Sequence, residues 1–584
     1  MEIRLRRSPG FVLGTPGRTP YGTVRTSMRA SFIRSRTLAP CTKRAVAASV
    51  ASMLFVALVS ATPNSPFNPI LPSTERAFAP LRWIAAGLGL GHLDAVGLMI
   101  VGLLATTSAA IGFLLILREA WNRRISLRLV VLLAIGFHLL VLMLPLLFSR
   151  DVYSYAYYGR IVSTYGGNPY VLTPKDFPLN SLWSLTWPGW RGTPSVYGPL
   201  FTWMSALLTG TAKSLRSLIT GFQLLAAVAS LGTIALVAWT VRRVRPDRAT
   251  FAVAIIGLNP IVIFHVVGGG HNDMLVAFFV AAAVALLFTK HELLSAIALT
   301  LGMSVKASAI VPLALLMVAV IASASPQRRR RVLVTYGAVV GGVWLAFALP
   351  FLQATNPTLG LMEVSGHDSW MAPGQLVVRA ASGIGGLVGG DAWREPAATG
   401  ARFALFGLSL AGVIWIGRRI WRDPDARTPL ALTAAWGWAF LAVMLPSPVL
   451  FTWYLVWALP LAWALPTIAR RGMVILSAFF VVTQLVTEAS ELPAVFRTVK
   501  LPFGHPIAIA VCLWIGIDLV RRLRRGTPLH DEDDRKHFGD AFEAGPAHGT
   551  EPETEVEDAA LEPVAAATTP GVAVTSPVSL LRLR

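Results

Sequence analysis

Arg150 and Asp151 stand side by side in a polar segment, residues 149–155 (Ser-Arg-Asp-Val-Tyr-Ser-Tyr), that follows a long apolar run. A carboxylate placed there could act as a general base and accept a proton from a hydroxyl group. The arginine beside it could bind an anion such as a phosphate. A plain ion pair at a membrane interface is the alternative interpretation of this pair.

A second polar segment, residues 268–273 (Gly-Gly-Gly-His-Asn-Asp), also separates two apolar runs. Each glycine disfavours a helix by about 1 kcal/mol relative to alanine, so the first helix should end here. Asn272 or Asp273 can cap the next helix, whose N-terminus would attract an anion. His271 adds a hydrogen-bond donor. The alternative is a tight turn whose polar residues only cap a helix.

Lys306 lies between two short apolar pieces, 293–304 and 308–324. Twelve helical residues extend about 18 Å, less than the hydrocarbon thickness, so the lysine should lie below the membrane surface. A lysine at that depth is costly and indicates a functional site. A side chain that reaches out to the interface is the alternative.

These segments must be positioned by membrane-spanning helices. The chain has 584 residues, of which 54% are hydrophobic and 14% charged, whereas soluble domains carry about 25% charged residues. Uncharged runs long enough to cross about 30 Å of hydrocarbon recur, at 95–117, 129–148 and 218–241. We therefore predict an all-α, polytopic integral membrane protein. The net charge of +21 comes from arginine clusters between apolar runs, which argues against nucleic acid as a partner. Two cysteines, at 41 and 512, predict no disulfide framework.

The arginine clusters also predict the topology, because cytoplasmic loops are rich in Lys and Arg. We expect about 14 transmembrane helices with both termini in the cytoplasm. Residues 1–44 are predicted to be a basic disordered tail, 45–525 the transmembrane domain with outer loops at 149–198 and 353–400, and 526–584 an acidic disordered tail. Segment 199–215 should lie in the outer interface rather than cross it. The other predicted helices are 45–61, 95–117, 129–148, 218–241, 250–267, 273–289, 293–304, 308–324, 332–352, 401–417, 428–446, 450–466, 473–487 and 506–520.

The predicted topology places all three polar segments on the non-cytoplasmic side of the membrane. The first outer loop adds further motifs, Asn168-Pro169-Tyr170 and Tyr197-Gly198-Pro199, and tryptophans that could stack on sugar rings or anchor the interface. No spacing of Cys, His, Asp or Glu indicates a metal site, and the sequence leaves metal dependence open.

Residues 149–155, Asn168-Pro169-Tyr170, Tyr197-Gly198-Pro199, Asn259-Pro260 and Gly270-His271-Asn272-Asp273 occur in this order and on one predicted side. In this the chain resembles the GT-C glycosyltransferases, and among them the actinobacterial polyprenyl-phosphomannose-dependent α-1,6-mannosyltransferases of lipomannan backbone synthesis. The resemblance covers about residues 45–520. The acidic loop follows the third predicted helix here, whereas it follows the first in simpler family members.

The resemblance implies mannosyl transfer from polyprenyl-phosphate-mannose, a lipid-linked donor, to a mannan or lipoglycan acceptor at the extracytoplasmic face of the cell membrane. It implies that Asp151 is the catalytic base and that Arg150, His271 and Lys306 bind the donor phosphate. It further implies that Tyr153, Tyr197, Asn272 and Asp273 bind substrate. No bound cofactor is expected beyond membrane lipid and the donor itself.

The predicted chemistry is coherent without the family. Phosphate is already a good leaving group, so one base and cations that stabilise the developing charge are sufficient. Two alternatives remain open at this point: a transporter or flippase of polyprenyl-linked sugars, and a GT-C enzyme that uses another sugar donor.

Overall fold

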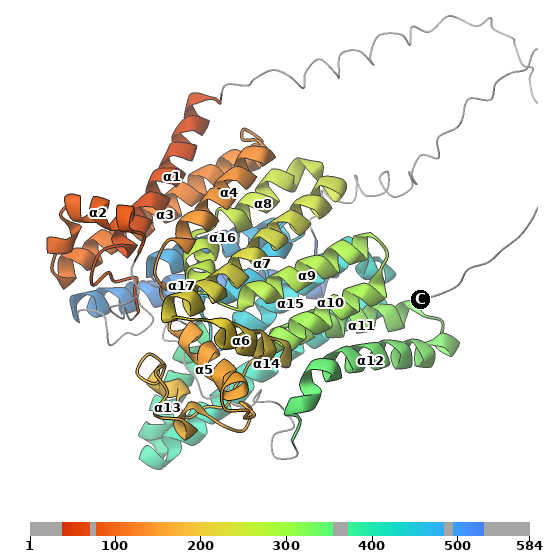
Figure 1. The fold of residues 1–584 in the computed structure, drawn as a ribbon. Helices are drawn as coiled ribbons and strands as arrows, with labels where there is room; N and C mark the ends of the chain where they lie inside the picture. The colour runs from red at the N-terminus through yellow and green to blue at the C-terminus, as the bar shows by residue number, and fades with distance from the viewer. Residues whose placement is uncertain (1–37, 70–76, 354–371, 484–493, 531–584) are drawn as a thin grey trace, which may run out of the picture. The chain divides into compact units, whose positions relative to one another are not determined.

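The computed structural model describes residues 38–69, 77–353, 372–483 and 494–530, and within these ranges every regular element is a helix (Figure 1). The chain divides into two units, residues 1–534 and 535–584, and the second lies outside the described residues. Most of both predicted tails also falls outside them. An all-helical chain is what an apolar sequence must form in lipid, where a backbone amide finds no water to bond.

Five helical segments are long and apolar enough to cross a membrane, and a bent pair, α8 (Ala249–Gly257) with the π-helix η5 (Ile261–Val267), could supply a sixth. The five are α1 (Pro40–Ser60), α3 (Ala95–Trp121), α7 (Leu215–Val244), α12 (Pro326–Ala348) extended by η7 (Leu349–Phe351), and α14 (Arg394–Arg422) preceded by η9 (Asp391–Trp393). The predicted total of about 14 passes and its sidedness stay predictions.

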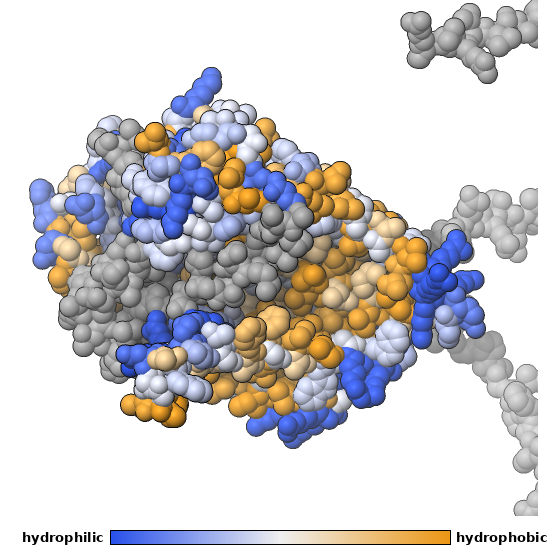
Figure 2. All heavy atoms as spheres, turned by 90° about the horizontal axis from the view of Figure 1, so that it is seen from below, coloured by the Kyte–Doolittle hydropathy of each residue, from blue (hydrophilic) through white to orange (hydrophobic). Residues whose placement is uncertain are grey.

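Large apolar side chains cover the outside of several of these helices. Leu104 is 58% exposed, Phe403 72% and Phe406 67%. Figure 2 shows broad hydrophobic areas on the face that it presents, with hydrophilic residues gathered toward the edges. Apolar surface of this extent on helices of spanning length fits a membrane protein.

Four shorter apolar helices follow the predicted boundaries closely, namely α9 (Asp273–Phe288), α10 (Glu292–Val305), α11 (Ile310–Ser323) and α15 (Pro429–Met444). Three further helices differ more from the predicted 129–148, 473–487 and 506–520: these are α4 (Leu127–Leu142), α16 (Thr467–Thr483) and α17 (Ala494–Arg525). Segment 199–215 forms a short helix, α6 (Pro199–Thr211), which is about 20 Å long and below spanning length. Whether it lies in the interface stays a prediction.

Three predicted elements are wrong in detail. The helix predicted over 129–148 ends at Leu142, because Pro145 and the left-handed Phe148 (φ 61°) cannot continue it. The helix predicted over 250–267 breaks ahead of Pro260. The predicted helix 450–466 is instead two short 3₁₀ segments, η11 (Thr452–Trp457) and η12 (Leu459–Leu461).

The two predicted outer loops contain helices in their described parts. Segment 149–198 opens with α5 (Asp151–Ser163), and the described part of 353–400 contains α13 (Pro373–Gly389) and the start of α14. Before them, α2 (Ala79–Gly87) lies in the segment between α1 and α3.

The most deeply buried part of the molecule is formed by α8, η5, α9 and α15, whose residues are buried on nearly every face. α9 and α10 pack side by side as an antiparallel hairpin, and α7 packs along α9. The N-terminus of α9 and the C-terminus of α10 therefore meet at one end of this core, and the start of α5 joins them there.

Candidate active site

Asp151 is the first residue of α5, and the backbone before it fixes its position. Phe148 adopts a left-handed conformation and its amide donates to the carbonyl of Phe67 at 2.7 Å. The amide of Asp151 donates to the Ser149 hydroxyl at 3.1 Å. The side chain of Asp151 keeps 21% of its surface exposed. A carboxylate at a helix N-terminus is stabilised by the free amides and the helix dipole.

The triglycine segment forms the predicted helix break directly beside α5. The π-helix η5 ends at Val267, and α9 begins at Asp273 after a turn in which Gly270 takes φ 62°. The Leu147 amide donates to the Gly268 carbonyl at 3.1 Å, which ties the turn to the chain before α5. A Cβ at Gly270 would lie 2.7 Å from Cγ2 of Val152, so glycine allows this close approach.

The turn brings His271 to Asp151. Nδ1 of His271 lies 3.5 Å from Oδ2 of Asp151 and 3.3 Å from the Tyr155 hydroxyl, which is itself 3.5 Å from the same carboxylate oxygen. The opposite face of the site is aromatic, because the His271 ring stacks on Trp453 of η11 with centroids 3.9 Å apart. A carboxylate, an imidazole and a phenol thus share one cluster.

A second carboxylate, Asp273, lies two residues after His271 and forms a buried ion pair. Its side chain has no exposed surface, and Oδ1 accepts from Nζ of Lys306 and from Nε1 of Trp457, each at 2.8 Å. The Lys306 ammonium also lies 4.6 Å from the Tyr454 ring centroid. Its side chain keeps 16% exposure, so Lys306 retains access to the site while it is paired.

Lys306 is held by the Tyr197-Gly198-Pro199 motif. α10 ends at Val305 and Lys306 is extended, while the Gly198 amide donates to the Val305 carbonyl at 2.9 Å. A Cβ at Gly198 would overlap the Ser304 carbonyl. Tyr197 in turn packs edge-on against Tyr155, with centroids 4.8 Å apart. Three sequence motifs are therefore joined by direct contacts.

The electrostatics distinguish Asp151 from its neighbours. Burial raises the pKa of Asp151 to about 6, Lys306 opposes this shift, and Asp273 reinforces it. Burial lowers the pKa of His271 well below its usual value, with Lys306 acting in the same direction. His271 is therefore a neutral imidazole at pH 7, so it could offer a ligand a hydrogen bond but no charge.

Several buried polar atoms at the turn have no hydrogen-bond partner within the described part of the chain. They are Oδ2 of Asp273, Nε2 of His271, and both amide atoms of Asn272. Buried polar groups are nearly always paired in folded proteins, so a cluster of unpaired ones beside the partly exposed Asp151 carboxylate fits a ligand rich in hydroxyl groups.

The remaining predicted site residues lie in α5 or before it. Arg150 is the half-buried N-cap residue of α5. Tyr153 is fully buried. It follows Asp151 by two residues, so its side chain lies on a different face of α5. The structure thus brings together Asp151, His271, Asn272, Asp273 and Lys306, with Tyr197 packed behind them. The described residues contain no group of three or more His, Cys, Asp or Glu that could hold a metal ion.

Tyr155 and the aromatic residues of η11 were missed. The spacing of Tyr155, four residues after Asp151 on a helix, places both on one face and could have indicated the contact. Trp453, Tyr454 and Trp457 lie in an apolar run that sequence analysis assigned to a membrane-spanning helix. Their density of aromatic rings was the available signal.

Comparison with known proteins identifies the part of the chain that carries this site. Residues 46–323 match the family model described as the N-terminal domain of α-(1→6)-mannopyranosyltransferase. This segment is just under half of the 584-residue chain, and its similarity is to the α-(1→6)-mannopyranosyltransferase family. The match includes Asp151, the triglycine turn and Lys306, whereas η11 lies beyond its end. It confirms the resemblance to the actinobacterial enzymes.

Individual relatives agree with the family match. The chain is 29% identical over 346 residues to the α-(1→6)-mannopyranosyltransferase A of Mycobacterium tuberculosis, covering 57% of this chain and 64% of that protein. A probable α-(1→6)-mannopyranosyltransferase of Mycolicibacterium smegmatis is 26% identical over 56% of this chain and 63% of its own length. The α-(1→6)-mannopyranosyltransferase A of Corynebacterium glutamicum is 29% identical over 30% of this chain and 36% of its own. The chain thus spans less than two thirds of the length of these relatives. No solved structure matches.

Proposed function

We propose that this protein transfers a mannosyl residue from polyprenyl-phosphate-mannose to a mannan or lipoglycan acceptor, forming an α-1,6 linkage at the extracytoplasmic face of the membrane. The observation that carries the proposal is the partly exposed Asp151 carboxylate, which lies within a cluster of buried polar groups and close to Lys306. The cluster belongs to the region that matches the mannosyltransferase family.

The reaction forms one bond and breaks one. The acceptor hydroxyl oxygen attacks the anomeric carbon of the donor, and its proton passes to Asp151. The bond between the anomeric carbon and the phosphate oxygen breaks, and polyprenyl phosphate leaves with the electron pair. A base with a pKa of about 6 is deprotonated at pH 7 and still accepts a proton effectively.

Lys306 supplies a positive charge that acts on the base. One of its ammonium protons is used by Asp273, which holds the nitrogen in place, and the others can donate to the phosphate oxygens of the leaving group. Such a preset cation stabilises charge in the transition state without reorganisation. Trp453 is buried between His271 and Phe451 and stacks on both rings, so it holds the imidazole in place beside the carboxylate.

The test uses full-length protein in membrane vesicles or detergent, with radiolabelled polyprenyl-phosphate-mannose and an α-mannoside acceptor. We expect labelled product whose new linkage is α-1,6 by methylation analysis. Asp151→Asn should abolish the product. The matched control is Asp391→Asn, which changes a carboxylate that is 93% exposed and paired only with Arg394 three residues along the chain.

The outcomes separate the proposal from its alternatives. If labelled donor crosses the vesicle membrane while no acceptor is modified, the protein is a transporter and the proposal fails. If product forms only from a different polyprenyl-phosphate sugar, the enzyme class stands and the assignment of mannose is wrong. Product at the normal rate from Asp151→Asn would remove Asp151 as the base.

A further inference from the structure

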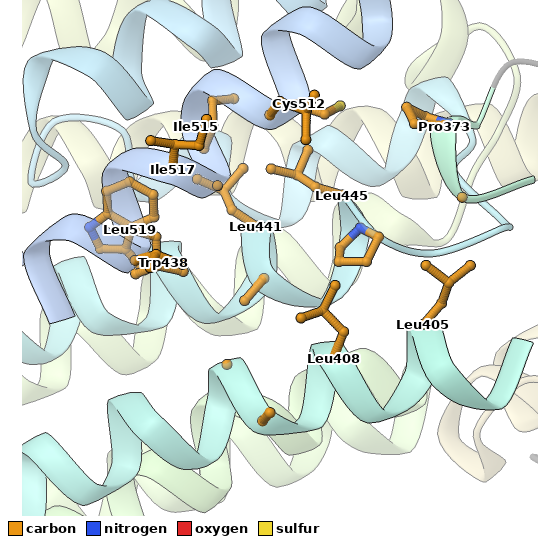
Figure 3. A pocket seen from close by; sticks show the side chains of 18 of the residues that line it. Pro373, Leu405, Leu408, Trp438, Leu441, Leu445, Cys512, Ile515, Ile517 and Leu519 are labelled. Atoms are coloured by element: carbon orange, nitrogen blue, oxygen red, sulfur yellow. The ribbon is translucent and has the colours of Figure 1, made fainter. Parts of the chain in front are cut away.

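A long apolar groove lies away from the candidate active site. It runs between α13, α14, α15 and α17 and has a volume of about 930 Å³ (Figure 3). Its walls include Pro373, Leu405, Leu408, Leu441, Leu445 and Leu513. The volume lies within the range of sites that hold a small ligand, and the lining is almost wholly hydrocarbon.

The groove is open to its surroundings along one side. Leu408 is 60% exposed, Leu513 58% and Ile517 46%. These side chains lie on helices whose outer surfaces are apolar, so the groove would open sideways into lipid. Its occupant should accordingly be a molecule that is already dissolved in the membrane.

The groove has a single charged end. Among its lining residues only Arg521 and Arg524 are charged, and they lie three residues apart at the C-terminal end of α17. Both are exposed, and neither forms an ion pair within the described ranges. Two arginines one helical turn apart can bind one phosphate group together.

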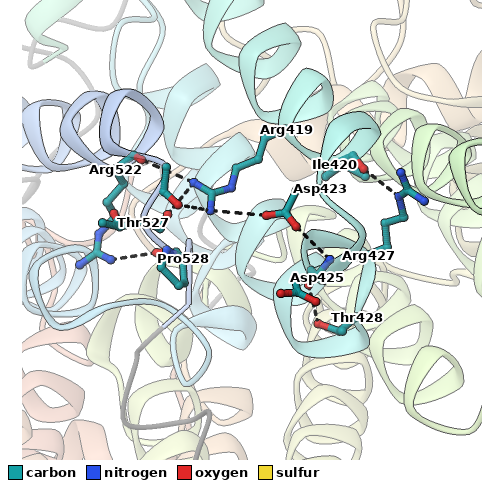
Figure 4. A network of polar contacts seen from close by, with 10 residues as sticks. Arg419, Ile420, Asp423, Asp425, Arg427, Thr428, Arg522, Thr527 and Pro528 are labelled. Carbon is teal, nitrogen blue, oxygen red and sulfur yellow. Dashed lines mark hydrogen bonds and ion pairs between the residues drawn. The ribbon is translucent and has the colours of Figure 1, made fainter. Parts of the chain in front are cut away.

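The neighbouring arginines, by contrast, are already occupied. Arg522 pairs with Asp518 at 3.0 Å and donates to the Pro528 carbonyl at 2.9 Å. Arg419 of α14 donates to the carbonyls of Thr527 and Gly526, at 2.6 and 2.7 Å (Figure 4). These bonds fix the end of α17 against α14, so the two uncommitted guanidinium groups have a rigid base.

The charged end points away from the reacting groups. At the other end of the groove, Gly374 packs against the carbonyls of Pro446 and Ser447, shortly before Trp453 and its contact with His271. At the charged end, Trp438 donates to the Leu529 carbonyl at 3.0 Å. A lipid-linked sugar donor must place its phosphate beside Asp151, so the arginines lie at the wrong end for it.

We propose that this groove binds an anionic membrane phospholipid, with an acyl chain along the apolar walls and its phosphate between Arg521 and Arg524. Basic pockets between membrane helices are suited to anionic headgroups. The lipid would fill the space between α13 and α14 on one side and α17 on the other. This role is separate from sugar transfer and does not depend on it.

The experiment measures lipid retention by native mass spectrometry of the full-length protein in mild detergent. Phosphatidylglycerol is compared with phosphatidylcholine of the same acyl chains. We expect one phosphatidylglycerol to be retained in preference. In Arg521→Ala/Arg524→Ala its affinity should fall about 30-fold, from the contribution of each arginine near an anionic lipid headgroup. Arg525→Ala is the matched control, since Arg525 is exposed in the same turn but does not line the groove.

A second pair of variants tests the groove itself. Gly516 lines it and faces open space, so Gly516→Phe should fill the groove and displace the lipid. Gly407→Phe adds the same ring at an exposed helical glycine of α14 outside the groove, and should retain the lipid.

Three results would overturn the proposal. One is equal retention of the two phospholipids, and another is a double arginine variant that behaves like Arg525→Ala. The third is a Gly516→Phe variant with a raised KM for the lipid-linked donor, together with arginine variants that bind phosphatidylglycerol normally. That pattern would assign the groove to the polyprenyl chain of the donor.

Discussion

The buried pair of Asp273 and Lys306 allows its structural and chemical roles to be separated. In Lys306→Met the carboxylate of Asp273 stays fully buried and keeps only the Trp457 indole as a partner. Removal of one member of a buried ion pair costs about 3–5 kcal/mol, because the remaining charge is uncompensated. Asp273→Asn should cost less, since the Lys306 ammonium is 16% exposed and still faces the Tyr454 ring.

The double variant Asp273→Asn/Lys306→Met removes both charges at once. It should therefore be more stable than Lys306→Met alone, with a coupling free energy of about 2 kcal/mol between the two positions. The free energy of unfolding is measured by equilibrium titration with SDS in mixed micelles, followed by helicity. Glu395→Gln/Arg402→Met is the matched control: that pair is also 2.8 Å apart, but its carboxylate is 77% exposed, so its coupling should stay within about 1 kcal/mol.

Activity then distinguishes the two roles of Lys306. If the ammonium binds the donor phosphate, the double variant recovers stability while mannosyl transfer stays slow and the KM for the donor stays high. Recovery of transfer together with stability would refute the phosphate assignment and leave Lys306 as a counter-ion of Asp273. A Lys306→Met variant as stable as the wild type would refute the argument from burial.

Three further predictions concern the base and its support. Asp151→Asn should lower kcat/KM about a hundred- to ten-thousand-fold. Wild-type kcat/KM should fall tenfold per pH unit below about pH 6, because the base must be deprotonated; a flat pH profile would contradict Asp151 as the base. Tyr155→Phe removes a hydrogen bond that lowers the pKa of Asp151, so the acidic limb of the profile should move to higher pH, and a shift to lower pH would rule out the contact. Gly198→Ala should reduce the free energy of unfolding by about 1–3 kcal/mol, because its Cβ would overlap the Ser304 carbonyl. The control Gly210→Ala has an ordinary 3.7 Å contact and should not reduce it; equal stability of the two variants would show that the contact between Gly198 and α10 does not require glycine.

The meeting of Asp273 and Lys306 could be predicted from the sequence. α9 has 16 residues and α10 has 14, so the two arms of this hairpin are nearly equal in length. The residue that opens the first arm must then lie beside the residue that closes the second. The helix break at the triglycine segment was also predicted and is confirmed. The ion pair between Asp273 and Lys306 follows from the hairpin geometry, but it was not predicted.

Backbone irregularities near Asp151 were harder to predict. The run 129–148 is apolar throughout, and hydropathy gives no reason to end a helix at Leu142. The left-handed Phe148 and the bond from Leu147 to Gly268 are set by contacts with segments far away in sequence. Local patterns report which residues prefer to be buried, whereas the direction in which Asp151 enters the site depends on these tertiary contacts.

The 3₁₀ conformation of η11 places two aromatic rings beside the Lys306 ammonium. In a 3₁₀-helix residues three apart are eclipsed, and accordingly the rings of Tyr454 and Trp457 stack with centroids 4.4 Å apart. Both rings lie near the Lys306 ammonium, at 4.6 and 5.5 Å, and the Trp457 indole bonds the carboxylate that pairs with it. An α-helix over 450–466 would turn two residues three apart by about 60° relative to each other. The two rings would then no longer be eclipsed, so the stacked pair that faces Lys306 depends on the 3₁₀ backbone of η11.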